Sequence, residues 1–126
     1  MSESEDKPAE ALASPVVCAA DELLGAPVTD AAGNRLGRLS HIMIEASSGA
    51  IIFGIVDFGY LLVRDGKLGP IPWRLLKPWD GGRKLRLDVE PEVLRSAPAF
   101  DPGDWPDMSD PRWSARVHAH FGLRSQ

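Results

Sequence analysis

The sequence predicts a mainly β protein: a small antiparallel β-barrel of five or six strands, followed by a short C-terminal helical extension. Two observations indicate this fold class. Between Val28 and Val89, short apolar stretches alternate with turn sequences rich in glycine, asparagine and aspartate, and no helical crossover separates them. After Val89 the apolar residues recur with the spacing of a helix instead of a strand.

Length and charge restrict the class of protein. The 126 residues suffice for one modest core, and we divide them into an acidic disordered tail (1–19), a barrel domain (20–90) and a helical extension (91–126). The net charge of −4 is concentrated in the tail, so the folded part lacks the broad basic surface of a nucleic-acid-binding protein.

Cysteine content and hydropathy indicate the compartment. The chain has one cysteine, Cys18, and its acidic N-terminal residues do not resemble a secretory signal. The longest apolar run, residues 50–56, is too short to cross a membrane. We therefore expect a cytoplasmic protein that does not insert directly into a membrane.

The first strands of the predicted barrel are short and joined by turns. A strand at 28–29 leads through a glycine-containing turn into a longer strand at 35–45. In the longer strand Leu39 and Ile42 stand three positions apart, which breaks the alternation of an amphipathic strand. A bulge at Ser40-His41 would bring both side chains to one face.

The stretch 50–58 is apolar on both of its faces. Its alternating residues divide into two sets, Ile51, Phe53 and Ile55 against Ile52, Val56 and Phe58. A strand with two apolar faces is central and covered on both sides. One face would look into the barrel, and the C-terminal segment is the candidate cover for the other.

The remaining strands follow from turn signals. Asp65-Gly66 predicts a hairpin turn, and Pro72-Trp73 interrupts the strand that follows it. Further strands are predicted at 60–63, 68–71, 76–79 and 83–89. The last of these alternates between apolar and charged residues, as a half-buried strand does.

The C-terminal extension is predicted to hold two short helices. The first begins at Pro91, and the second begins at Pro111 with Ser109 or Asp110 as its cap. The apolar residues of the second helix recur every four positions: Trp113, Val117 and Phe121. This stripe would dock on the barrel or on a second subunit.

Three motifs carry a resemblance to a known family. They are the opening L-G-x-x-V-x-D-x-x-G-x-x-L-G at 24–37, the Ser48-Gly49 turn before the apolar strand, and Ile71-Pro72-Trp73. Over about residues 21–89 the chain resembles the PRC-barrel family, which is named for the cytoplasmic domain of the photosynthetic reaction-centre H subunit and includes a related domain of the ribosome maturation factor RimM. The resemblance implies a six-stranded barrel that binds other macromolecules and does not catalyse a reaction.

We expect no catalytic, cofactor or metal site in this sequence. The aspartates of 101–110 lack the spacing of a calcium loop, and turn and capping roles fit them better. A metal-dependent hydrolase that uses them stays open as an alternative. His118 and His120 are two positions apart, which does not suit a metal pair on a helix, and we expect them at the surface or in an interface.

The leading interpretation is a non-enzymatic protein-binding or assembly module, whose partner is another protein or a second copy in a dimer. The candidate partner or self-association surface is apolar and mainly aromatic: Trp73, Trp79, Trp105, Trp113, Val117 and Phe121. The alternative is an RNA-binding or ribosome-associated domain that uses the basic aromatic stretch 73–86. Its candidate contacts are Arg83, Lys84 and Arg86, although Asp88 on the same face argues against nucleic acid.

Overall fold

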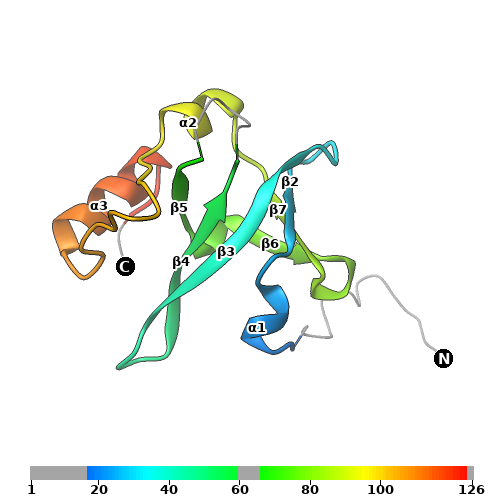
Figure 1. The fold of residues 1–126 in the computed structure, drawn as a ribbon, viewed down its shortest axis with the longest axis horizontal. Coiled ribbons are helices and arrows are strands. Elements are labelled where there is room, and N and C mark those ends of the chain that lie inside the picture. The colour runs from blue at the N-terminus through cyan, green and yellow to red at the C-terminus, as the bar shows by residue number, and fades with distance from the viewer. Residues whose placement is uncertain (1–16, 60–65, 125–126) are drawn as a thin grey trace.

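The computed structural model describes residues 17–59 and 66–124, and its main element is one six-stranded sheet (Figure 1). The strands are β2 (Pro27–Thr29), β3 (Arg35–Glu45), β4 (Ala50–Asp57), β5 (Leu68–Pro72), β6 (Leu76–Trp79) and β7 (Lys84–Leu87). The helices are α1 (Ala20–Leu23), α2 (Pro91–Ser96) and α3 (Pro111–His120), with 3-10 turns η3 (Trp73–Leu75) and η4 (Asp80–Gly82). The predicted mainly β class is confirmed, whereas the tail up to residue 16 and the predicted strand at 60–63 lie outside the described residues.

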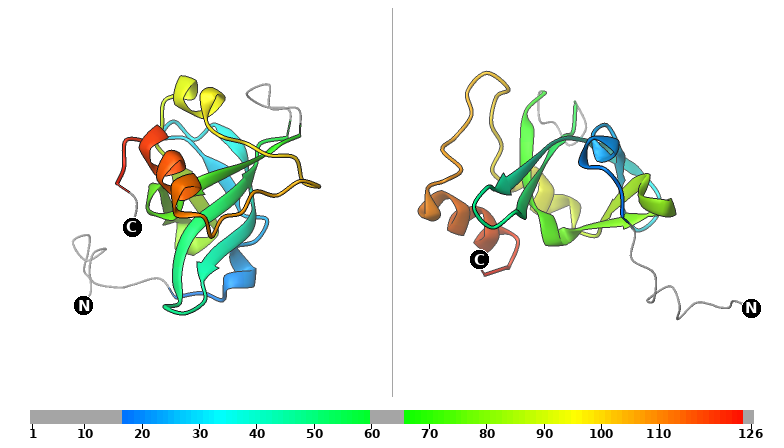
Figure 2. Two further views of the ribbon diagram at one scale, coloured as in Figure 1. Left: turned by 90° about the vertical axis from the view of Figure 1, so that its left-hand side faces the viewer. Right: turned by 90° about the horizontal axis from the view of Figure 1, so that it is seen from below.

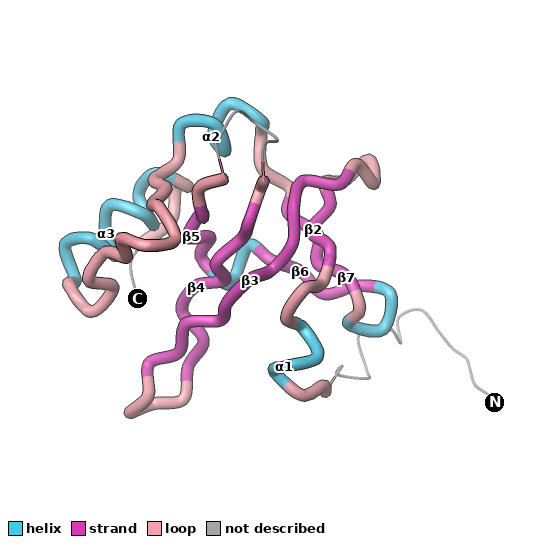
Figure 3. The backbone as a smooth tube through the Cα atoms, viewed as in Figure 1, coloured by secondary structure: helices cyan, strands magenta, loops and turns pink. Residues whose placement is uncertain are grey.

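The sheet is mixed and open, in contrast to the fully antiparallel barrel expected from the turn signals. Its strand order is β5-β4-β3-β2-β7-β6, and β2 pairs with β7 in parallel through Val28 and Leu85. Two parallel strands need a long connection between them. Here the chain from β3 to β6 forms that connection between β2 and β7. The edge strands β5 and β6 are joined by the short turn η3, so the sheet curls strongly, although no pairing of the described residues closes it (Figure 3).

Two bulges shape the β3–β4 hairpin. Leu39 pairs with Val56 and His41 pairs with Ile55, so Ser40 is the extra residue, and the predicted bulge is confirmed. A second bulge leaves Ile52 without a cross-strand partner, because Phe53 pairs with Met43 and Ile51 pairs with Ile44. The sequence did not predict this second bulge.

The bulge at Ile52 changes the face on which that side chain lies. Simple alternation placed Ile52 on the same face as Val56 and Phe58, and this placement is wrong. Ile52 instead packs with Phe53 and Ile55 on the opposite side of β4. An extra residue in a strand interrupts the period of two, so side chains beyond it no longer follow the expected order.

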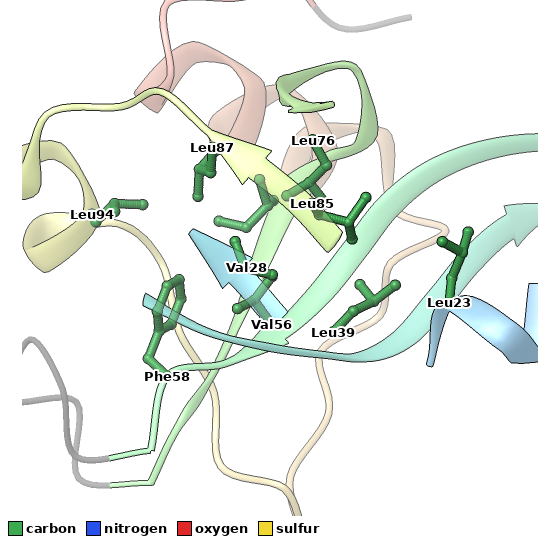
Figure 4. Close-up of a cluster of buried hydrophobic side chains, with 10 residues drawn as sticks. Leu23, Val28, Leu39, Val56, Phe58, Leu76, Leu85, Leu87 and Leu94 are labelled. Carbon is green, nitrogen blue, oxygen red and sulfur yellow. The ribbon is translucent and has the colours of Figure 1, made fainter. Parts of the chain in front are cut away.

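The main core lies inside the curled sheet (Figure 4). Its buried members come from all six strands and from both flanking helices: Leu23, Val28, Leu39, Val56, Phe58, Ile71, Leu76, Leu85, Leu87 and Leu94. Gly54 allows this packing, since a Cβ atom there would stand 2.5 Å from Leu76 Cδ1 and 3.0 Å from Leu39 Cδ1. A small residue in the central strand thus lets β6 approach β4 across the interior.

A second core lies on the other side of β4 and β5, beneath α3. It contains Phe53, Ile55, Leu68, Phe100 and Val117. In Figure 2, α3 lies beside β4 and β5, on the side away from β6 and β7. The C-terminal segment therefore covers the second apolar face of the central strand, in this same chain.

The start of α3 forms as the sequence predicted. The Asp110 carboxylate accepts a hydrogen bond of 2.9 Å from the backbone N–H of Arg112, and Pro111 is the first helical residue. Gly122, just past the helix, has φ +74°, a backbone conformation that favours glycine. These local signals fix where the helix begins and ends.

Candidate functional site

The apolar stripe of α3 is part of the chain's own core. Val117 is fully buried, and Phe121 is half-buried against both cores. The half-buried Trp113 ring packs against Phe53, with 5.4 Å between ring centroids. The surface that these residues offer to a partner is therefore small in this conformation.

Trp79 and the three candidate nucleic-acid contacts lie together at the β6–β7 edge of the sheet. The Lys84 Nζ atom stands 4.9 Å from the centroid of the Trp79 ring. Arg86 Nε lies 3.0 Å from the Asp88 carboxylate, and Arg83 is exposed beside them. One of the three bases is thus paired with an acid and another is stacked on an indole ring.

Trp105 joins the loop before α3 to the sheet. Its ring lies edge-on to His41 of β3 and tilted against Phe100, with 4.9 Å between centroids in both pairs. Its Nε1 atom donates a 2.8 Å hydrogen bond to the Pro102 carbonyl oxygen. No local sequence pattern predicts the contact of His41 with Trp105, since the two residues are far apart in the chain.

The β3–β4 hairpin extends beyond the rest of the sheet (Figures 1 and 3). The pairing of β4 with β5 ends at Phe53, and hydrogen bonds from β3 to the segment before it end at Leu39. We call residues 40–45 and 50–52 the projecting ribbon. Among the described residues, no strand pairs with either outer edge of this ribbon.

One exposed large apolar side chain, Ile44, stands on the projecting ribbon beside half-buried ones. Ile44 is 58% exposed, and among the described large hydrophobic residues only Val17 is more exposed. A two-stranded hairpin is marginally stable alone, and unpaired strand edges are ready to pair with another chain. The ribbon therefore has the features of a surface that a partner covers.

A groove of about 350 Å³ lies between the ribbon and the start of α3. Its apolar walls are Met43, Ile44, Ile52, Phe53, Met108 and Pro111, and Glu45 lies at its border. We call this the methionine groove. Sequence reasoning missed it because its two walls come from β3–β4 and from residues 108–114.

A second groove of about 480 Å³ lies beside the first, and the two share Glu45 and Ile52 as lining residues. Its lining includes Ile51, Pro72, Trp73, Arg74 and His118. We call this the tryptophan groove. Trp73, one of the predicted surface residues, is thus half-buried next to the ribbon, at the turn between β5 and β6.

The sequence predicts His118 at the surface or in an interface, and the surface placement is wrong, because the ring is buried within this chain. The His118 side chain is 2% exposed, with Nδ1 2.8 Å from the Ser114 carbonyl oxygen and the ring 5.2 Å from that of Phe53. His120 is half-buried, and its Nε2 lies 2.8 Å from the Val93 carbonyl oxygen. Both rings connect α3 to its neighbours, because the buried face of this short helix is wider than one stripe.

The aspartates of 101–110 serve local turns in the structure. Asp107 accepts a 3.0 Å hydrogen bond from the Ser109 backbone N–H, and Asp110 caps α3. The pKa of Asp110 lies below the ordinary 3.8, first because of the Arg112 backbone hydrogen bond and then because of the Arg112 side chain. In the part of the chain that the structure describes, no three His, Cys, Asp or Glu side chains gather into a metal-binding group.

The fold and its surfaces define a class of protein, a small β-barrel-like module whose most distinctive exposed features are apolar. A family model described as the PRC-barrel domain matches residues 15–94, and the chain belongs to this family. PRC-barrel domains are generally non-catalytic and mediate protein interactions. No curated protein matches the chain.

The region that matches the family model stops before the C-terminal helix α3. It ends within α2, so it includes the projecting ribbon but neither the 101–110 loop nor α3. One wall of the methionine groove therefore lies inside the matched region and the other lies outside it. None of the described helices is long and apolar enough to cross a membrane.

Proposed function

We propose that this chain is a non-enzymatic protein-binding or assembly module that binds its partner through the projecting ribbon. The observation that carries the proposal is the exposure of Ile44 at the end of a ribbon with unpaired edges. Burying such a side chain fully contributes about 1.5–3 kcal/mol relative to leaving it in water. A partner strand or helix laid on the ribbon would gain this energy.

The surroundings of the ribbon support a larger contact. Both grooves lie along it, Trp73 lines the tryptophan groove, and Trp105 packs on His41 of the ribbon. Binding surfaces commonly combine a central apolar anchor with half-exposed aromatic residues. Trp79 lies at the opposite end of the sheet, so we do not include it in the same surface.

The partner is a second protein or a second copy of this chain. A ribbon edge can pair with the same edge of another copy as readily as with a different strand. Cys18 is a free and exposed thiol, which supports the cytoplasm as the place where the module works.

Substitution of the ribbon tests the proposal. We expect Ile44→Glu to remove a specific partner that the unmodified chain retains from a lysate of the cells that produce it, without lowering the melting temperature. Val17→Glu is the matched control, because it makes the same change from an exposed apolar side chain to a carboxylate outside the ribbon. Retention of the same partners by all three proteins, with sedimentation also unchanged, would contradict a role for the ribbon.

A further inference from the structure

We infer that the methionine groove binds two or three apolar side chains of a basic amphipathic helix, a partner segment that also carries lysine or arginine. The inference rests on the proposed function and names the chemistry of the partner at that site. It follows from the shape of the groove, the chemistry of its walls and the charge at its rim.

The walls of the groove suit an apolar anchor of variable shape. Met43, Ile52 and Phe53 come from the ribbon, and Met108 and Pro111 come from the segment that enters α3. Met43 and Met108 are the only methionines of the chain besides Met1. Methionine side chains are unbranched and polarisable, and they adapt to ligands of different shape.

The size of the groove favours a side-chain anchor over a large ligand. Its volume of about 350 Å³ lies near the lower end of the range for small-molecule pockets. Two or three apolar side chains, spaced as on one face of a helix, would fill such a space. The half-exposed Trp105 extends the same side of β3 through its contact with His41.

The rim of the groove favours a cation beside that anchor. Glu45 lines the groove on the ribbon side. On the other side the exposed Asp107 directly precedes the lining residue Met108, without being part of the lining itself. The segment 101–110 holds four aspartates and no basic residue. The nearest base on α3, Arg112, already pairs with Asp110 at 3.4 Å.

The start of α3 does not offer a competing anion site. The Asp110 carboxylate already accepts the hydrogen bond of the Arg112 N–H, and Pro111 has no N–H to donate. A second carboxylate or phosphate at this helix end would meet the charge of Asp110. Both sides of the groove therefore disfavour an acidic partner.

The tryptophan groove is the weaker site for the same ligand. Arg74 borders it together with Glu45, so its rim has no single sign of charge. The Arg74 side chain also donates a 3.4 Å hydrogen bond to the Arg124 carbonyl oxygen. The backbone at Arg124 thus lies beside that groove.

Methionine methyl groups provide a direct readout of binding. The full chain is labelled with ¹³C at the methionine methyls, and Met43→Leu and Met108→Leu assign the resonances. The probe is an acetylated and amidated helical peptide with leucines at i, i+3, i+4 and i+7 and lysines at its other positions. Two further peptides have glutamate in place of each lysine, or serine in place of each leucine.

We expect the leucine–lysine peptide to shift the Met43 and Met108 resonances in a saturable manner and to leave that of Met1 unchanged. The glutamate and serine peptides should bind at least about tenfold more weakly, a difference of about 1.4 kcal/mol. Glu45→Gln with Asp107→Asn should weaken the lysine peptide, and added salt should do the same. Lys84→Glu, distant from the groove, should change neither the shifts nor the affinity.

Several results would overturn the inference. Equal affinity for the lysine and glutamate peptides would remove the charge argument, and unshifted Met43 and Met108 resonances at about millimolar lysine peptide would remove the site. Shifts that depend on protein concentration alone would show that a second copy fills the groove. If Ile44→Glu still loses its partner while the peptide fails, this inference falls and the proposed function stands. If Ile44→Glu keeps every partner while the lysine peptide binds, the proposed function of the ribbon falls and the peptide site in the groove stands.

Discussion

The indole ring of Trp113 packs edge-on against the phenyl ring of Phe53, with 5.4 Å between centroids and 69° between ring planes. The contact joins α3 to the central strand of the sheet, on the face that the main core does not use. Such aromatic pairs contribute about 0.5–1.5 kcal/mol beyond the area that they bury. The helix is therefore an integral part of the folded chain.

Truncation of Val117 should destabilise the fold, because its side chain is fully buried between α3 and the sheet. We expect Val117→Ala to lower the free energy of unfolding by about 2 kcal/mol, from lost burial and an unfilled cavity. Urea denaturation followed by tryptophan fluorescence measures the change. Val17→Ala is the matched control, since Val17 is 88% exposed, and an equal loss in both variants would show that α3 does not stabilise the fold.

A side chain at Gly37 should also destabilise the fold. A Cβ atom there would stand 2.4 Å from the Asp57 carbonyl oxygen, and backbone atoms of a paired strand cannot easily move away. We expect Gly37→Ala to cost about 1–3 kcal/mol, the range for overpacking. Thermal unfolding of Gly103→Ala provides the comparison, because a Cβ atom at Gly103 meets nothing within 4 Å.

The cap of α3 should make stability depend on pH. The pKa of Asp110 is lowered by hydrogen bonds from Arg112, so its charged form is favoured in the folded state. Its contribution is complete above the unfolded pKa and disappears as the pH falls through the lower folded pKa. We expect Asp110→Ala to reduce the melting temperature at neutral pH and to match the wild type in strong acid.

Asparagine at position 110 separates the cap from the charge. Asp110→Asn keeps an oxygen that can accept from the Arg112 N–H but does not titrate. The difference in melting temperature between Asp110→Asn and Asp110→Ala should therefore be the same at acidic and neutral pH. A wild-type advantage over Asp110→Ala that persists unchanged in strong acid would contradict the role of the carboxylate charge.

The basic β6–β7 edge of the sheet allows the RNA-binding alternative to be tested. Arg86 is paired with Asp88, and Lys84 lies over Trp79, so few free cations face outward together. We expect no salt-dependent retention on single-stranded RNA, and no difference between the wild type and Lys84→Glu with Arg86→Glu. Retention that falls steeply with salt and is lost in the double variant would favour the RNA-binding alternative.

Local sequence signals predicted the local features of the fold. The spacing of Leu39 and Ile42 required a bulge, and Asp110-Pro111 marked the start of a helix. The two apolar faces of β4 required a second cover, and the stripe through Val117 was the available candidate. The first two inferences depend on neighbours within a few residues, where propensity and periodicity act. The third matched two local apolar patterns, one on β4 and one on α3, that each lacked a partner.

Long-range placement could not be predicted in the same way. The parallel pairing of Val28 with Leu85, the contact of His41 with Trp105 and the burial of His118 all join distant segments. No local pattern specifies such pairs, because they depend on how the whole sheet curls. The methionine groove belongs to this group, which is why the predicted partner surface contained tryptophans but no methionine.

The position of β2 between β3 and β7 has a consequence for how the chain reaches its native state. On one side β2 pairs with a strand that follows closely in sequence, and on the other with the last strand of the sheet. Ordering the second pair requires closing a long loop, which costs more chain entropy than a hairpin does. During synthesis, β2 and β3 can pair early, whereas the far edge of β2 stays open until β7 has emerged. The docking of β7 should therefore limit the rate of folding. Destabilised variants should aggregate through the edge of β2 that stays unpaired until β7 docks.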